Sequence, residues 1–312
     1  MITIWVPKRL VEIDLYNVAA RSPQALADLS EQSYAQRIDY AAQKVQLSGA
    51  KIVMLTGPSA SGKTTSAHKV AEALEASGTP AHVISLDNFF KGAQYYPRLP
   101  DGTLDYENPD TLDMPLIRQC LSELSTTGKT VLPIYDFTTE SRSSETETLD
   151  LKGGVCIVEG IHALNDDITA KHPEAFKLYI SARSNVEFEG SVVFKGTWMR
   201  LVRRTVRDKL FRAYDPAKTI AMWANVRRGE KLYISPFKNK ANLMLDTALE
   251  YELPVMNHIA TELFSSIPEG IERYEELKQV LPAIQLFGHI DNDLVAPDSL
   301  VREFIGGGIY EQ

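Results

Sequence analysis

The residue pattern that most directly indicates chemistry is a glycine-rich run early in the chain. Residues 57–64 read Gly-Pro-Ser-Ala-Ser-Gly-Lys-Thr and fit the spacing G-x-x-x-x-G-K-[ST], with an apolar run before them and a helix-forming run after them. Glycines let backbone N–H groups curl around phosphate oxygens, the lysine reaches the β- and γ-phosphates, and the threonine ligates Mg²⁺. We therefore predict a nucleotide phosphate site, a P-loop. Its residues are Gly57, Ser59, Ala60, Ser61, Gly62, Lys63, Thr64 and Thr65.

Two acidic residues follow other predicted strands. Asp87 closes the apolar run 82–86, and Glu159 closes the run 155–158. In a parallel sheet, ligands bind outside the carboxyl ends of the strands, so both carboxylates should face the phosphates. One of them can hold Mg²⁺, directly or through water, while the other accepts a proton from an attacking hydroxyl. These strand ends therefore predict a site for phosphoryl transfer.

A third feature is a cluster of arginines in the second half of the chain. Its members are Arg200, Arg203, Arg204, Arg207 and Arg212. On a helix, spacings of three and four place the first four on one broad face, which would repel itself unless acids or phosphates met it. A solvated helix face is the usual explanation of such a run. Beside a P-loop the better interpretation is a lid that closes on the transferred phosphate, because phosphoryl transfer depends on positioning and electrostatic stabilisation.

The elements that position these residues follow from hydrophobic patterning. Short runs rich in β-branched residues predict strands at 52–55, 82–86, 131–135, 155–158 and 178–180. Helical spacing predicts helices at 30–47, 63–76, 111–124, 198–212, 217–226, 260–264, 271–281 and 299–304. Polar, turn-rich stretches are expected to be loops at 91–109 and 138–149. Strands that alternate with helices predict an α/β fold with a parallel sheet flanked by helices.

Composition and charge exclude several classes of protein. The chain has 312 residues, of which 44% are apolar and 24% charged, a globular mix that excludes a disordered or fibrous protein. The formal charge of −8 argues against a general nucleic-acid or anionic-membrane binder, because such proteins need a positive field. Residues 195–240 carry a local charge of +10, which leaves −18 for the rest, so this block is expected to meet an anion.

The cysteines and the first residues bear on location. Cys120 and Cys156 stand alone, outside any C-x-x-C or Cys/His ligand pattern, which is typical of a reducing compartment. The first ten residues lack the basic and apolar regions of a signal peptide, and no stretch approaches 18 uncharged apolar residues. We expect a cytoplasmic protein with no nucleic-acid partner and no membrane partner.

Six motifs follow one another along the chain. They are GPSASGKTT at 57–65, LDNFF at 86–90, YENPD at 106–110, PIYDF at 133–137, VEGI at 158–161 and RLVRRTVRD at 200–208. In this order they resemble the uridine kinase and phosphoribulokinase family of P-loop kinases. Residues 229–253 and the ending SLVREFIGGG look like a bacterial uridine kinase-like branch, so the resemblance covers nearly the whole chain from about Glu31. It implies a P-loop NTPase fold, ATP and Mg²⁺ as cofactors, and a small-molecule acceptor such as a nucleoside.

The resemblance also implies roles by position. Asp87 matches the base that deprotonates a nucleoside 5′-hydroxyl, Glu159 the acid near the metal, and Tyr135 an aromatic residue beside the nucleobase. Lys63, Arg203 and Arg207 are implied to act with Asp87 in phosphoryl transfer. Metal contacts are implied for Thr64, Glu159 and Asp87, a nucleotide contact for Arg204, and acceptor contacts for Asp87, Glu107, Tyr135, Glu140, Arg200 and Arg212.

Three positions depart from the family pattern. Glu107 stands where the acid that holds the ribose hydroxyls is usually Asp, and its side chain is longer by a methylene group. Glu140 replaces a base-contacting His. Because a carboxylate only accepts hydrogen bonds, Glu140 faces the O4 of uracil unfavourably and suits the 4-amino group of cytosine or a sugar hydroxyl better. Ala213 follows Arg212 where the lid usually has Gly, which limits a glycine-dependent turn.

We expect three parts in the chain. These are a lead-in segment with one helix at 1–47, a P-loop kinase domain at 48–256 with its lid at about 195–230, and a helical C-terminal extension at 257–312 packed on that domain. Gly306–Gly308 is expected to be a loose end, with an approach to a ligand as the alternative. Members of the family are commonly oligomeric, so the resemblance also allows a homo-oligomer.

Two other interpretations of function stay open at this point. The first is a kinase of the same fold that acts on a sugar phosphate or another small metabolite. The second is a non-catalytic ATP-binding regulatory protein. The presence of Lys63, Thr64, Asp87 and Glu159 argues against the second, because a protein that only binds a nucleotide needs no base.

Overall fold

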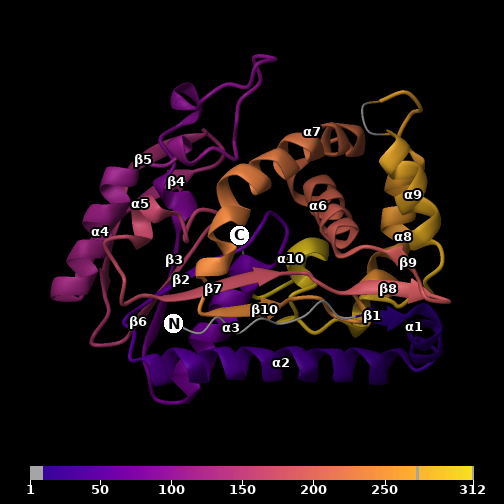
Figure 1. Ribbon diagram of the computed structural model, residues 1–312, viewed down its shortest axis with the longest axis horizontal. Helices are drawn as coiled ribbons and strands as arrows, with labels where there is room; N and C mark the ends of the chain where they lie inside the picture. The colour runs from indigo at the N-terminus through magenta and orange to yellow at the C-terminus, as the bar shows by residue number, and fades with distance from the viewer. Residues whose placement is uncertain (1–9, 272–273, 311–312) are drawn as a thin grey trace.

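A five-stranded parallel sheet forms the centre of the protein, described from a computed structural model over residues 10–271 and 274–310. In the order β10-β7-β2-β6-β3 its strands are Leu243–Asp246, Phe176–Ser181, Ile52–Thr56, Val155–Glu159 and Ala81–Ser85 (Figure 1). All neighbouring strands pair in parallel. Every residue of β2 and β6 is buried, as expected for strands covered on both faces. The predicted α/β fold with a parallel sheet is confirmed.

Helices cover both faces of this sheet. Successive residues of a strand point to opposite faces, so each central strand packs against a helical layer on either side. The helices nearest to it are α2 (Pro23–Ser48), α3 (Lys63–Ala76), α4 (Met114–Thr127) and α5 (Asp166–Thr169). Val53 and Leu55 of β2 pack in a core cluster with α2 and α3, whereas Ile52 and Met54 pack in a second cluster with α4. In Figure 1, α2 runs along the lower side and α4 stands at the left.

The predicted strand at 131–135 exists but lies outside the parallel sheet. It belongs to β4 (Lys129–Asp136), which pairs antiparallel with β5 (Ser141–Asp150) in a two-stranded ribbon. The prediction of a loop at 138–149 was therefore wrong for most of that range. The reason is that β5 is polar and largely exposed, so its hydrophobic pattern carries no strand signal and only its β-branched threonines favour this conformation.

Four further strands were not predicted from the sequence. β10 is a four-residue strand at one edge of the parallel sheet. The other three form a small separate sheet of β1 (Leu10–Glu12), β8 (Asn185–Phe188) and β9 (Ser191–Phe194), beside the short helix α1 (Ile13–Ala19). All four are three or four residues long, which is too short for period-2 alternation to show in the sequence.

The second half of the chain is helical, as predicted. Its helices are α6 (Gly196–Arg212), α7 (Pro216–Gly229), α8 (Glu252–Ser265), α9 (Tyr274–Ile284) and α10 (Arg302–Ile305), with a π-helical turn at Glu230–Ile234 after α7. The helix predicted at 271–281 starts next to two residues outside the described ranges. At the right of Figure 1, α6, α8 and α9 stand together, and α6 packs against α7, α8 and α10.

The C-terminal segment is packed, not loose. Leu300 and Phe304 are fully buried in the core cluster that contains α3 and α6. Gly306 has a left-handed φ of 85° and lies so close to Phe211 that an added Cβ would come within 2.6 Å of its ring. The Arg302 guanidinium also donates to the Gly306 carbonyl oxygen at 3.1 Å. The expectation of a loose end at Gly306–Gly308 was therefore wrong, whereas the division of the chain into three parts stays a prediction.

None of the described helices is both long enough and apolar enough to span a membrane.

Candidate active site

The P-loop connects the end of the central strand β2 to α3, and close packing fixes its shape. A Cβ at Gly57 would lie 2.4 Å from the carbonyl oxygen of Ile180, so only glycine fits there. Gly62 has a left-handed φ of 82°, and an added Cβ would lie 2.5 Å from the Leu300 side chain. The backbone of this loop is therefore free of side chains on the sides where it meets β7 and the C-terminal segment, as a phosphate-binding loop requires.

Thr56, the last residue of β2, joins the P-loop strand to its neighbour. Its hydroxyl donates to the carbonyl oxygens of Gly160 and Ile161 at 2.9 and 2.8 Å. These two residues directly follow β6. The hydrogen bonds therefore hold the carboxyl ends of β2 and β6 at the same level, so that residues from both strands reach one site.

Glu159 is the last residue of β6, and Asp87 lies two residues after the neighbouring strand β3, in a short 3-10 helix at Leu86–Phe89. Glu159 is paired across the sheet with Ser85, whose hydroxyl donates to the Glu159 carboxylate at 2.6 Å. Burial, together with the charge of Asp87, raises the pKa of Glu159 to about 7. Burial also raises the pKa of Asp87, while the charge of Lys63 opposes this shift. The two carboxylates and the lysine thus form one electrostatic cluster beside the P-loop.

This cluster fits a magnesium–nucleotide complex. Mg²⁺ is commonly bound through one or two carboxylates while phosphates and water supply the remaining ligands. Glu159 and Asp87 can supply those carboxylates, and Thr64, the second residue of α3, can supply a hydroxyl. Within residues 10–271 and 274–310, no group of three or more His, Cys, Asp or Glu residues could by itself hold a metal ion.

A carboxylate already lies at the N-terminus of α3. Glu303, in α10, accepts hydrogen bonds from the Thr65 backbone N–H at 3.3 Å and from the Thr65 hydroxyl at 2.8 Å. Lys69, one turn further along α3, pairs with Asp298 of the same C-terminal segment at 2.8 Å. The positive end of a helix favours such anions. The C-terminal segment therefore contributes a negative charge directly to the predicted phosphate site.

Two of the predicted lid arginines are buried against the back of the P-loop. Arg203 is fully buried and forms a two-point ion pair with Glu252, at 2.7 and 3.0 Å, and its guanidinium also donates to the Ala60 carbonyl oxygen at 3.4 Å. Arg200 donates to the Ser59 carbonyl oxygen at 2.9 Å and pairs with Glu230. In this conformation both arginines hold the loop from outside the phosphate-binding side.

The other three arginines share one buried acid, Asp208. Its carboxylate lies 3.2 Å from Arg204, 2.9 Å from Arg207 and 3.5 Å from Arg212. Arg204 also donates to the Ser59 hydroxyl at 2.8 Å. Protein carboxylates thus meet this arginine face, as one of the two kinds of partner that its helical spacing requires, and a lid that closes on phosphate stays a prediction.

Arg212 differs from the rest of the cluster because its side chain is about half exposed. Burial and the charge of Arg207 lower the pKa of Arg212 to about 10, and Arg212 and Arg207 in turn oppose the upward shift in the pKa of Asp87. The helix ends at Ala213, which adopts a left-handed φ of 51°. The turn therefore forms with alanine, at a cost of about 1 kcal/mol relative to glycine.

Glu107 lies in the long loop between β3 and α4, which the sequence predicted as irregular. The Glu107 side chain is buried, and its Oε2 has no hydrogen-bond partner in the described protein. Burial raises its pKa, whereas Arg204 and Lys63 oppose this shift through their positive charges. Glu107 is therefore close to the P-loop lysine and carries an oxygen that can accept a hydrogen bond from a ligand.

Tyr135 lies in a group of aromatic rings beside this loop. Phe90 and Phe137 stand edge-on to its ring, at centroid distances of 5.5 and 5.1 Å, and its hydroxyl lies 3.4 Å from that of Tyr96. Phe137 is 62% exposed, so the group presents a ring surface to solvent. Glu140 is also exposed, at the turn between β4 and β5.

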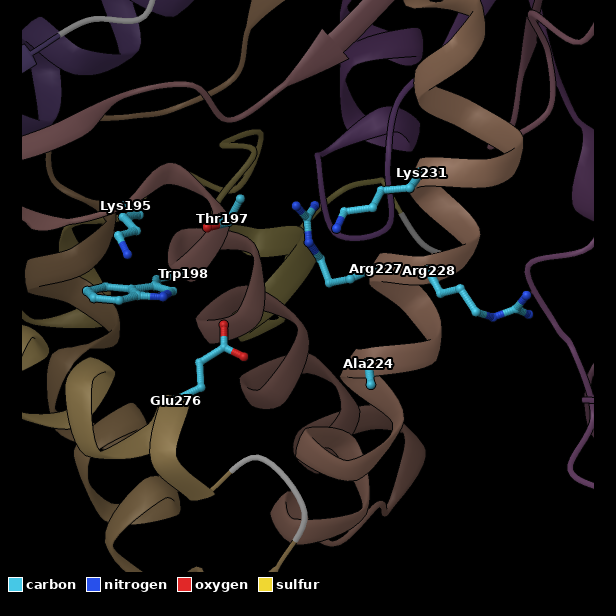
Figure 2. A pocket seen from close by; sticks show the side chains of 8 residues that line it. All are labelled: Lys195, Thr197, Trp198, Ala224, Arg227, Arg228, Lys231 and Glu276. Carbon is cyan, nitrogen blue, oxygen red and sulfur yellow. The ribbon is translucent and has the colours of Figure 1, made fainter. Parts of the chain in front are cut away.

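One open pocket lies away from this cluster. It has a volume of about 440 Å³ between α6, α7 and α9 and is lined by Lys195, Thr197, Trp198, Ala224, Arg227, Arg228, Lys231 and Glu276 (Figure 2). In Figure 2, Arg227 and Arg228 leave α7 on opposite sides. Arg228 pairs with Asp105 of the 91–113 loop at 2.8 Å, and Arg227 pairs with Glu230. None of the residues predicted from the motifs lines this pocket.

Sequence reasoning missed the acids that pair with the arginines. Asp208 stands four residues from both Arg204 and Arg212, so helical spacing could have identified it. Glu252 and Glu303 come from segments far along the chain, and no local pattern connects them to the P-loop. His162, three residues after Glu159, was also missed; it is buried.

Comparison with known proteins decides the family. The sequence model of the Phosphoribulokinase / Uridine kinase family matches residues 52–253. The chain belongs to this family. Uridine kinase from Deinococcus deserti is 28% identical over 195 residues, 62% of this chain and 86% of that protein. Uridine-cytidine kinase-like 1 from Mus musculus is 31% identical over 194 residues, 61% of this chain and 32% of that protein.

A solved structure supports the fold. A protein described as a fructose transport system kinase, from Silicibacter sp. TM1040, superimposes with a TM-score of 0.50 at 21% identity, over 66% of this chain and 98% of that one. The family and the P-loop kinase fold predicted from the motifs are thus confirmed. Membership of this family supports phosphorylation of a small molecule with ATP.

The buried Arg203–Glu252 pair leads to a stability prediction. Glu252→Gln removes the charge that balances a fully buried guanidinium, so the free energy of unfolding should fall by about 3 kcal/mol or more. Urea denaturation measures this change. The matched control is Glu275→Gln, which breaks an exposed ion pair with Lys278 and should cost less than about 0.5 kcal/mol. Equal losses in the two variants would contradict this account of the pair.

Proposed function

We propose that this protein is an ATP-dependent kinase that transfers the γ-phosphate to the 5′-hydroxyl of a nucleoside. The observation that carries the proposal is the cluster of Asp87, Glu159 and Lys63 at the ends of β3, β6 and β2, beside a P-loop. The curated relatives named as uridine kinases support the nucleoside as acceptor.

The proposed roles follow from charge and position. Lys63 and the N-terminus of α3 hold the phosphates of ATP, and Mg²⁺ bound near Thr64 and Glu159 would neutralise part of their charge. Asp87 accepts the proton of the attacking hydroxyl. Burial raises the pKa of its carboxyl, which strengthens it as a base, while the charges of Lys63, Arg212 and Arg207 oppose that shift. The acceptor oxygen then bonds to the γ-phosphorus as its bond to the bridging oxygen breaks, and ADP leaves.

The lid arginines divide into two groups in this proposal. Arg207 and Arg212 act electrostatically on Asp87, so we assign contact with the transferred phosphate to them. Arg200, Arg203 and Arg204 bond to the P-loop itself, so we assign them to positioning it. For Arg203 this replaces the catalytic role implied by the motif, because its guanidinium is fully buried with Glu252.

The acceptor pocket is proposed to lie between Glu107 and the aromatic group around Tyr135. Glu107 would accept hydrogen bonds from the ribose hydroxyls, and the exposed edge of the aromatic group would pack on the base. The base contact of Glu140 stays a proposal from its motif position. Because its carboxylate only accepts hydrogen bonds, cytosine should be a better base than uracil.

The first test measures ADP release from ATP and Mg²⁺ with a panel of nucleosides and small sugars. Cytidine should be turned over at least as well as uridine, and Asp87→Asn should lower the rate by about 100-fold or more while ATP still binds. Asp166→Asn, which removes an exposed carboxylate paired with Lys240, should leave the rate unchanged. Strong preference for uridine would refute the role of Glu140. ATP binding without turnover of any acceptor would refute the proposed function.

Glu303 gives a second test, which needs only nucleotide binding. Its carboxylate occupies Thr65 groups that the phosphates of ATP would use, so Glu303→Gln should strengthen ATP and ADP binding, on the order of tenfold. Isothermal titration calorimetry measures the two dissociation constants. Asp298→Asn removes a carboxylate from the same segment but away from Thr65, and it should change them less than about twofold. Weaker binding by Glu303→Gln would contradict this interpretation.

A further inference from the structure

The pocket between α6, α7 and α9 is rich in cations and lies outside the candidate active site. Its volume of about 440 Å³ is within the range of small-molecule sites. Of the described residues that line it, one, Glu276, is acidic and four are basic, namely Lys195, Arg227, Arg228 and Lys231. These four belong to the basic block at 195–240, which we expect from its charge to meet an anion, and none of them is a lid arginine.

The basic side chains from α7 and the turn after it divide between two sides. Arg228 pairs with Asp105, in the loop before α4, at 2.8 Å. Arg227 leaves the helix on the opposite side in Figure 2, where the ends of Arg227 and Lys231 point toward Thr197 at the start of α6. Arg228 is thus engaged elsewhere, whereas Arg227 and Lys231 form a basic wall of the pocket.

The protein balances the charge of this wall only in part. Arg227 pairs with Glu230, but Glu230 also pairs with Arg200 at 2.9 Å, so one carboxylate serves two guanidinium groups. Neither Lys195 nor Lys231 forms an ion pair within the described chain. Like charges that line one pocket repel each other, and an anion between them replaces this repulsion by attraction.

The start of α6 adds to the positive potential. This helix of 17 residues has Lys195 at its N-cap position, no acidic residue in its first turn and, in the part of the chain described, no side chain that caps it. Ser, Thr, Asp or Asn is usual at an N-cap, and the helix dipole favours a negative group there. Lys195 instead lies over the Trp198 ring, 4.8 Å from its centre. An anion in the pocket would supply the charge that this helix start lacks.

We propose that this pocket is a second anion site, which binds the phosphoryl group of a small molecule. Lys195, Arg227 and Lys231 would contact the phosphoryl oxygens, since a guanidinium and two ammonium groups offer several charged donors to such a group. The Glu276 carboxylate only accepts hydrogen bonds, so it suits a hydroxyl group of the same molecule and repels a second anionic group. The ligand class is therefore a phosphate ester of a hydroxylated molecule, with inorganic phosphate as the other source of the same chemistry.

Isothermal titration calorimetry on protein saturated with ADP and Mg²⁺, which fill the P-loop, tests this site. Ribose 5-phosphate and inorganic phosphate are the two probes. Lys195→Gln combined with Lys231→Gln should raise the dissociation constant of the bound probe at least about tenfold, because two cations leave the pocket. The matched control combines Lys209→Gln with Lys218→Gln, which removes two exposed cations of the same block from outside the pocket, and it should change this constant less than about twofold.

The outcomes separate the site from the reaction. Tighter binding of ribose 5-phosphate identifies an ester as the ligand and tighter binding of inorganic phosphate identifies the free ion; either result supports the site if only the Lys195 and Lys231 variant loses it. No binding of either probe to the ADP-saturated protein overturns the proposal. Equal binding by the two double variants also overturns it, because the probe then binds elsewhere. None of these results depends on turnover of an acceptor, so a failure of the proposed function is distinguishable.

Discussion

The balance of charge around buried guanidinium groups is the constraint on which this structure depends. Arg203 lies at a place with no contact to solvent, and the Glu252 carboxylate supplies the compensating charge. A buried ion requires such compensation because moving it out of water costs several kcal/mol. By pairing there, Glu252 connects α8 to α6, and Arg203 connects both to Ala60 of the P-loop. The P-loop is thus tied to α6 and α8 through this buried ion pair.

The same principle organises the side of the site that faces the phosphates. Lys63 and the start of α3 are positive, and Asp87, Glu159 and Glu303 surround them with negative charge. The burial that raises the pKa values of Asp87 and Glu159 is opposed by the lysine and, for Asp87, also by Arg207 and Arg212. A magnesium–nucleotide complex carries both signs of charge, so it can replace this internal balance when it binds.

The sequence predicted the parts of this arrangement that local rules control. The P-loop, Asp87 and Glu159 could be placed because strand ends in a parallel sheet meet at one edge. The strand β5 was missed because its face is polar, and β10 because four residues show no periodicity. Spacing placed the arginines on one helix, but their partners Glu230 and Glu252 follow from packing between distant segments. His162 likewise contacts the ring of Tyr233, in the π-helical turn after α7, and no pattern near His162 reveals this.

The hydroxyl groups of the acceptor connect the proposed chemistry at Asp87 with the proposed acceptor pocket at Glu107. In the proposed reaction, one hydroxyl of the acceptor gives its proton to Asp87, and the free Glu107 Oε2 accepts a hydrogen bond from another. Arg207 and Arg212, which oppose the upward shift in the pKa of Asp87, are the arginines proposed to contact the transferred phosphate.

The most direct measurement of the central claim is identification of the product by mass spectrometry and ³¹P NMR after incubation with ATP, Mg²⁺ and cytidine. The account predicts one ADP for each nucleoside monophosphate, with the phosphorus coupled to the two protons of the 5′-methylene group. Formation of ADP and inorganic phosphate alone, at a rate independent of the acceptor, would contradict it, and so would a phosphate attached at a secondary hydroxyl.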